Sequence, residues 1–307
     1  MAKHRKYKKQ HYLPACYLKA WCDPVVPENQ TPFVWIFDKT GGSGRRKAPE
    51  KIFRETDMYT IHLPDDSRDL RLEHGLNKLE SMFSSIRIAK LDRGGVLTLE
   101  EHVTVCAFVS AMHSRTPERR EHWRKQWERP LKMMDQLADR LRTATREQKR
   151  SMTLMSGPVD KEPTISHDQV RRLVETPLQT LLPTLIEVET PIFAGMDAVI
   201  FETDNPIGFI TSDAPCVIYD TNMHKFRSPF HGVSLISQTV EVLFPISPRR
   251  CFFLNRQGVN GYVTATNETL LHINQSMAAF ADRQIVASVA ELPQEWFNTQ
   301  SRQPQEG

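Results

Sequence analysis

The chain has 307 residues, of which 39% are hydrophobic and 25% are charged, and its formal net charge is +3 at pH 7. This length can bury a sizeable core in one large domain or two modest ones, and the composition excludes disordered, collagen-like and disulfide-dependent miniprotein classes. No apolar stretch approaches the roughly 20 residues of a membrane span, so we expect a globular protein without a membrane segment.

Residues 1–9 form a basic arm. Five cations precede Gln10 without an intervening acid: Lys3, Arg5, Lys6, Lys8 and Lys9. A second excess lies in residues 115–150, where twelve Lys and Arg stand against six Asp and Glu. Either region attracts phosphate-bearing partners, because neutralised phosphates release condensed counterions. For the second region the alternative is a solvated helix with ion pairs three or four residues apart.

The segment after the arm predicts a short helix, a strand and a longer helix. Residues 10–24 have apolar side chains at helical spacing, and Pro14 can open that helix. β-branched and aromatic residues predict a strand over residues 31–39. Apolar residues recur with a period of about 3.6 over residues 68–91, which predicts an amphipathic helix there.

The central part of the chain carries three helix start signals. They are Thr98 with Glu101, Thr116 with Pro117, and Ser166 with Gln169. The first precedes an almost entirely apolar helix over residues 103–112, which we expect to form a hairpin with the long basic helix that follows. We expect Pro177 and Pro183 to divide or end the third helix.

After Pro191 the pattern changes to short apolar runs with period 2. These runs predict strands over residues 198–201, 207–210, 216–219, 240–244 and 251–254. Turn-forming residues at 204–206 predict a hairpin between the first two strands. A last helix over residues 267–282 and a strand over 285–289 precede a polar tail at 296–307.

These elements predict an α+β fold in a single domain over residues 10–295. The helical part covers about residues 68–188, and a β-rich part covers about residues 191–290. We expect the N-terminal segment to pack against both parts. The five cysteines are odd in number and widely scattered without paired CxxC spacing, which indicates free thiols in a reducing cytoplasm.

The common catalytic signatures are missing from the sequence, so polar residues in apolar or turn-rich surroundings remain as candidates. His11 could be a general base, a metal ligand or a phosphate donor, and it could equally be a structural histidine. Asp213 follows a predicted strand, where it could bind a divalent cation or close its own turn. Glu73 and Glu80 lie two turns apart on one helix face, where the alternative is simple solvation.

Several sequence blocks carry a resemblance to a known family. They are residues 10–21 (QHYLPACYLKAW), the helix containing Leu79 and Glu80, residues 209–215 (FITSDAP), residues 244–248 (FPISP) and residues 274–283. In this order the chain resembles the bacterial domain-of-unknown-function family 4238. The resemblance implies a bacterial cytoplasmic protein from accessory gene neighbourhoods such as phage defence. It implies no activity, but it favours four polar motif residues: His11, Glu80, Asp213 and Asn274.

Our leading hypothesis from the sequence is a metal-dependent, nuclease-like effector that acts on nucleic acid. His11, Glu80 and Asp213 would hold Mg²⁺ or Mn²⁺ and activate water, which requires His11 and Asp213 to meet in one cleft. Five cations would bind the phosphate backbone: Lys6, Lys8, Lys9, Arg115 and Arg119. Five further polar residues complete the candidate set: Gln10, Thr211, Ser212, Asn274 and Arg283.

The sequence leaves open whether the protein is an enzyme. One alternative is a non-catalytic module that binds nucleic acid or protein, in which the QHYLP and TSDAP blocks are structural turns that lock the sheet to the helices. Another is a transferase or hydrolase for a small molecule, which would have a deep and mostly apolar pocket beside His11.

Overall fold

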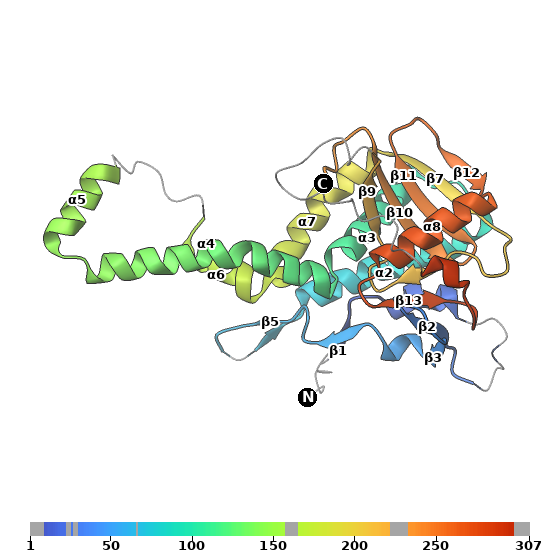
Figure 1. The fold of residues 1–307 in the computed structure, drawn as a ribbon, viewed down its shortest axis with the longest axis horizontal. Helices are drawn as coiled ribbons and strands as arrows, with labels where there is room; N and C mark the ends of the chain where they lie inside the picture. Colours follow the sequence, from blue (N-terminus) through green and yellow to red (C-terminus); the bar gives the residue numbers. More distant parts are fainter. Residues whose placement is uncertain are drawn as a thin grey trace.

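The structure, a computed structural model, describes residues 9–22, 26, 30–65, 67–156, 165–221 and 233–297. Apart from Lys9, the basic arm therefore lies outside the described residues. The protein is a mixed α+β structure with a helical central region and a β-rich C-terminal third (Figure 1).

The bounds of the described elements are as follows. The α-helices are α1 (Ala15–Leu18), α2 (Arg71–Ala89), α3 (Leu99–Ser114), α4 (Pro117–Thr143), α5 (Arg146–Ser156), α6 (His167–Glu175), α7 (Pro177–Ala194) and α8 (Asn267–Phe280). Short 3₁₀ helices are η1 (Lys19–Trp21), η2 (Pro49–Lys51), η3 (Leu91–Arg93) and η5 (Gln294–Trp296). The strands are β1 (Lys9–His11), β2 (Val34–Asp38), β3 (Arg45–Lys47), β4 (Arg54–Thr56), β5 (Ile61–His62), β6 (Arg68–Asp69), β7 (Asp197–Glu202), β8 (Thr211–Ser212), β9 (Val217–Asp220), β10 (Val240–Ser247), β11 (Arg250–Asn255), β12 (Gly261–Thr264) and β13 (Gln284–Ala287).

The larger sheet has the strand order β12-β7-β11-β10-β9. Its neighbours are antiparallel except β12 and β7, which run parallel. A second sheet has the order β3-β2-β13-β8, so strands from both ends of the sequence pair in it. The β1–β4 and β5–β6 pairs form two small separate ladders.

The core lies on both faces of the larger sheet. On one face Phe83 of α2 stacks on Phe108 of α3 at 3.8 Å between ring centroids, and both rings contact Phe244 of β10. Helix α8 covers the other face, where Ile273 belongs to a separate buried cluster. Tyr17 joins the helical and the β-rich parts, because its ring lies beside that of Phe108 (6.2 Å between centroids) and its hydroxyl donates to the Pro245 carbonyl oxygen (2.7 Å). The N-terminal segment thus packs against both parts, as predicted.

Helix α4 leaves the body of the protein and projects beyond it, ending near α5 (Figure 1). Thr116 caps its first turn by accepting from the Arg119 N–H, and Pro117 occupies its first position, which confirms the predicted start. The predicted hairpin with α3 is wrong. Helix α3 packs mainly along α7, because its buried apolar residues cover nearly its whole circumference, whereas α4 packs along α6.

The two predicted capping boxes are confirmed at Thr98 and Ser166. Pro183, in contrast, neither divides nor ends a helix. It lies exposed inside α7, which is held to the core by the buried side chains of Leu178, Leu182 and Phe193.

The predicted hairpin at residues 204–206 is also wrong. Strand β7 pairs with β11 and β12, and residues 207–210 form no strand. This segment is held instead by the Phe209 N–H, which donates to the Pro248 carbonyl oxygen (2.8 Å). The preceding Gly208 has φ of 70°, and a Cβ there would lie 2.1 Å from that same oxygen, so only glycine fits. Within the described ranges, no helix is long and apolar enough to cross a membrane.

Candidate functional site

Two adjoining hollows form a polar cleft beside the start of α4. The smaller hollow has a volume of about 390 Å³ and the larger about 720 Å³. Both lie between the first turns of α4 and the corner that joins α8 to β13. Three residues line both hollows and mark the boundary between them: Glu118, His122 and Asp282.

His113 lines the smaller hollow and is held from behind by a buried carboxylate. Ser110, His113 and Ser114 lie three and four residues apart and therefore share one face of α3. All three contact Glu189 of α7. The Nδ1 atom of His113 lies 3.1 Å from Oε1, and the Ser110 hydroxyl donates to Oε2 at 2.8 Å.

The electrostatics of this pair indicate a neutral imidazole beside an ionised carboxylate. Burial lowers the pKa of His113, and the nearby Arg119 guanidinium lowers it further. Burial alone would raise the pKa of Glu189, but hydrogen bonds from His113 and Ser110 hold it below its ordinary value. His113 therefore donates its Nδ1–H to Glu189, which leaves Nε2 as a lone-pair acceptor. The Arg119 guanidinium donates to this Nε2.

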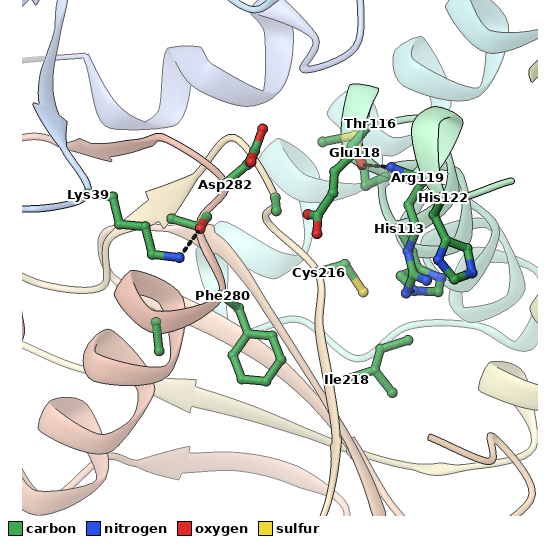
Figure 2. A pocket seen from close by; sticks show the side chains of 14 residues that line it. Lys39, His113, Thr116, Glu118, Arg119, His122, Cys216, Ile218, Phe280 and Asp282 are labelled. Atoms are coloured by element: carbon green, nitrogen blue, oxygen red, sulfur yellow. Dashed lines mark hydrogen bonds between the residues drawn. The ribbon is translucent and has the colours of Figure 1, made fainter. Parts of the chain in front are cut away.

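Cations and a second imidazole complete the smaller hollow. Figure 2 shows Arg119 and His122 on the same side as His113, with Lys39 on the opposite side. The Lys39 ammonium donates to the Ala281 carbonyl oxygen (2.7 Å), so a main-chain acceptor holds it in place. The hollow thus presents two positive charges, two imidazole rings and the carboxylates of Glu118 and Asp282 to a ligand.

Cys216 lines the same hollow, but its chemistry is unsuited to nucleophilic attack. Burial raises the pKa of the thiol far above its ordinary value, which keeps it protonated. Reactive cysteines need the opposite shift, because the thiolate is the nucleophile. The imidazole chemistry of the hollow therefore does not form a cysteine hydrolase site.

The larger hollow has a mixed charge. Arg120 pairs with Glu55, and Lys125 lies 3.7 Å from Glu121. Arg283 is highly exposed and lies 3.7 Å from Asp282. These pairs are solvent-accessible, so each contributes little to stability and can open toward a ligand.

The structure places His11 apart from this cleft. Its ring lines neither hollow, and its Nε2 atom is buried without a hydrogen-bond partner in the described structure. Burial lowers its pKa, whereas a hydrogen bond to the Glu50 backbone raises it. His11 is close enough to Glu80 to feel its charge. Two of the three predicted metal ligands are thus near each other.

Asp213 does not join them. Its carboxylate is 5% exposed and accepts the backbone N–H groups of the three residues that lead into β13: Asp282 at 2.9 Å, Arg283 at 2.8 Å and Gln284 at 3.0 Å. Burial raises the pKa of Asp213 to about 6, although these amides favour the carboxylate. The prediction that His11 and Asp213 share one cleft is therefore wrong. Asp213 closes a non-local turn at the rim of the larger hollow.

No group of three or more His, Cys, Asp or Glu side chains in the described part of the chain is arranged to hold a metal ion. The predicted ligand set of His11, Glu80 and Asp213 is thus not assembled. The reason is that Asp213 uses both carboxylate oxygens on backbone amides, and Glu80 uses one oxygen on Arg115 (2.8 Å).

Arg115 also differs from its predicted role. Its side chain is 1% exposed and donates to the carbonyl oxygens of His11 (2.7 Å) and Tyr12 (2.9 Å). A guanidinium so placed cannot reach a phosphate backbone in this conformation. Arg115 thus joins the end of α3 to the QHYLP block and to Glu80 of α2.

The remaining predicted residues divide into buried and exposed sets. Gln10 forms hydrogen bonds with Tyr59 and Thr60, and Asn274 forms hydrogen bonds with Gly208 and Ile210. The Thr211 hydroxyl shares a hydrogen bond with the Tyr17 hydroxyl. The Ser212 hydroxyl accepts from the Ala214 N–H. These contacts fit the interpretation of the blocks as structural turns. Lys9 is exposed, Arg119 and Arg283 line the cleft, and Lys6 and Lys8 lie outside the described residues.

Four residues of the cleft and its support were not predicted from the sequence: His113, Glu189, His122 and Lys39. A signal was present for the first two. Ser110, His113 and Ser114 interrupt an otherwise apolar helix at helical spacing, and Glu189 lies in a strongly apolar helix. Buried polar side chains need partners, so two such helices predict mutual contacts.

The fold and this cleft define an α+β protein with a polar site between its central helices and its C-terminal sheets. The chain belongs to the family described as protein of unknown function (DUF4238), whose model matches residues 9–291. No curated protein and no solved structure matches the chain significantly.

Proposed function

We propose that this protein binds nucleic acid in the cleft and cleaves its phosphodiester bonds. The observation that carries the proposal is the arrangement of His113, oriented by Glu189, beside Arg119 and opposite Lys39. Guanidinium and ammonium groups bind phosphoryl oxygens, and an oriented imidazole transfers protons. All three groups lie in one hollow.

In this proposal His113 acts as a general base. Its Nε2 accepts the proton of the attacking hydroxyl or water once Arg119 turns from the imidazole to a phosphoryl oxygen. Arg119 and Lys39 then stabilise the negative charge that develops on the phosphoryl group. Glu189 keeps the Nδ1–H tautomer and stabilises the imidazolium, which is the role of the third member of a catalytic triad.

A non-catalytic nucleic-acid-binding module is the second candidate, and one contact favours it. In the structure the Nε2 atom of His113 is engaged by Arg119, so the imidazole is not free to accept a proton. Glu118 and Asp282 at the boundary of the hollows also oppose an anion. In this second function the cations bind phosphate, and His113 only supports Arg119.

One experiment separates the two candidates. Labelled single-stranded RNA and DNA of mixed sequence are incubated with wild type, His113→Asn and His62→Asn, and both binding and cleavage are measured. His62 is exposed in β5 and lines neither hollow, so it is the matched control. Catalysis predicts that His113→Asn keeps binding but loses about 10²- to 10⁴-fold in rate. Binding without cleavage by any variant supports the module.

The metal-dependent form of the hypothesis is tested in the same assay. Adding EDTA, or Mg²⁺ and Mn²⁺ in turn, shows whether cleavage needs a divalent cation.

We further propose that the protein acts in the bacterial cytoplasm, in an accessory or defence-related context. This extension rests on the family resemblance and on the five free cysteines.

A further inference from the structure

We infer that the substrate of this cleft is RNA and that the reaction is a transesterification in which the 2′-hydroxyl of the substrate is the nucleophile, with His113 as base and His122 as acid. This inference rests on the proposed function, because it names the substrate class of the same cleft. It is carried by a juxtaposition of side chains: two imidazoles and a guanidinium line one hollow.

The two imidazoles occupy different positions in the cleft. His113 lines only the smaller hollow, whereas His122 lines both and so stands at their boundary. Figure 2 shows Arg119 beside them on the same wall. A phosphoryl group bound by Arg119 would therefore have His113 on the side of the smaller hollow and His122 at the boundary between the hollows. Proton transfer at both ends of a phosphoryl transfer needs two such groups.

The two rings also differ in what holds them. His113 is fixed through Nδ1 by Glu189, which sets one tautomer and orients the base. His122 is exposed, and its side chain makes a long contact with the Gln126 amide (3.5 Å) and an edge contact with the Trp123 ring. Burial lowers the pKa of both rings, which favours their neutral forms. A bound phosphate, being an anion, favours the protonated form of His122.

The nature of this chemistry selects RNA. Imidazoles transfer protons but provide no strong electrophile, so the nucleophile must be well positioned to react. In RNA the 2′-hydroxyl is already part of the substrate, and intramolecular attack has effective molarities on the order of 10⁵–10⁸ M. DNA lacks this hydroxyl, so the same residues would have to activate a separate water molecule.

The step balances without a further reactant. The 2′-hydroxyl proton passes to Nε2 of His113, the 2′-oxygen bonds to phosphorus, and the bond from phosphorus to the 5′-oxygen breaks. The departing 5′-oxygen takes a proton from protonated His122. The products are a 2′,3′-cyclic phosphate and a 5′-hydroxyl end, and exchange with solvent restores the two rings.

The test uses the full chain with one mixed-sequence RNA and the DNA of the same sequence, in the presence of EDTA. We expect the protein to bind both the RNA and the DNA but to cleave only the RNA. The products should carry 2′,3′-cyclic phosphate ends. His113→Asn and His122→Asn should each lower the rate about 10²- to 10⁴-fold at unchanged affinity, and His62→Asn should leave it unchanged. Because both pKa values are lowered, the bell-shaped profile of kcat/KM should peak below pH 6.5.

The test distinguishes failure of this inference from failure of the proposed function. Cleavage of DNA at a comparable rate, loss of cleavage in EDTA, or products with 5′-phosphate ends would overturn this inference and leave the proposed function standing. A variant His122→Asn with wild-type rate would also overturn it, since this exposed residue can be replaced without disturbing the core. Absence of binding and cleavage of either strand would overturn both proposals.

Discussion

The imidazole of His113 in α3 meets the carboxylate of Glu189 in α7 at 3.1 Å, although the two residues are 76 positions apart in sequence. Helices α3 and α7 pack closely, and His113 of this pair lines the smaller hollow. The pair therefore connects the buried core to the surface at which we place the chemistry.

Replacing Glu189 by Gln tests the orientation of His113. The change removes the charge that raises the pKa of the imidazole, so the pKa of His113 should fall further, as NMR titration would show. The free energy of unfolding should decrease by about 1–3 kcal/mol, because a charged hydrogen-bond acceptor is lost. Glu187→Gln, on an exposed position of the same helix, is the control and should leave both quantities unchanged. An unaltered titration of His113 in Glu189→Gln would refute the orienting role.

Asp213→Ala should destabilise the protein strongly. Three backbone amides at the start of β13 would lose their acceptor, for which we expect about 2–4 kcal/mol in urea unfolding. Asp204→Ala, at an exposed position of the same region, should have almost no effect. A loss below about 1 kcal/mol in Asp213→Ala would contradict a structural role.

The pH dependence of Asp213 gives a separate prediction. Burial raises its pKa to about 6, so the folded protein binds a proton that the unfolded chain has released. The stability that this group contributes is complete below its unfolded pKa of about 4 and is lost as the pH rises through about 6. Asp213→Asn does not titrate, so the wild type should lose stability relative to this variant across that window. A constant difference between the two would show an unshifted pKa.

The histidines have the opposite dependence. Burial lowers the pKa of both His11 and His113, so the unfolded chain binds more protons than the native protein in mildly acidic solution. The stability contributed by their neutral forms is complete above about pH 6.5 and is lost as the pH falls through the lowered values. Urea unfolding should show this decrease, and the double variant His11→Gln/His113→Asn should show a smaller one. An equal slope in the double variant would assign the effect to other groups.

Arg115 should act as a structural clamp. Arg115→Ala removes a buried guanidinium and leaves Glu80 and two carbonyl oxygens without their donor, for which we expect a loss of about 3–5 kcal/mol. Arg129→Ala, on an exposed face of α4, should cost less than about 0.5 kcal/mol. Thermal unfolding of both variants checks the difference, and similar melting temperatures would refute the clamp.

The parts of the fold that could be predicted from the sequence are those fixed by local contacts. The capping boxes at Thr98 and Ser166 each depend on a residue three positions away, and the structure confirms both. The Thr116 cap with Pro117 is equally local. Most strand positions after residue 191 followed from the apolar pattern with period 2, but residues 207–210 form no strand and β12 was not predicted. Strand partners did not follow from this pattern, because pairing of β7 with β11 and β12 depends on residues about 50 or more positions away.

The candidate site shows the same limit. Asp213 looked like a ligand because its partners, the amides of residues 282–284, carry no side-chain signal. Arg115 stood at a helix end where a surface cation is common, and only the packing of α2 and the N-terminal segment buries it. His113 and Glu189 were each visible as polar residues in apolar helices, but their contact depends on how those helices pack.

The most direct test of the central claim, that the cleft binds phosphodiesters, is a fluorescence anisotropy titration with a labelled single-stranded RNA at low and moderate salt. We predict that the double variant Lys39→Ala/Arg119→Ala weakens binding by at least about tenfold and reduces its salt dependence. The matched variant Arg129→Ala/Lys132→Ala, which removes two cations outside the cleft, should bind nearly as the wild type does. Equal affinities for wild type and the Lys39→Ala/Arg119→Ala variant would contradict the account.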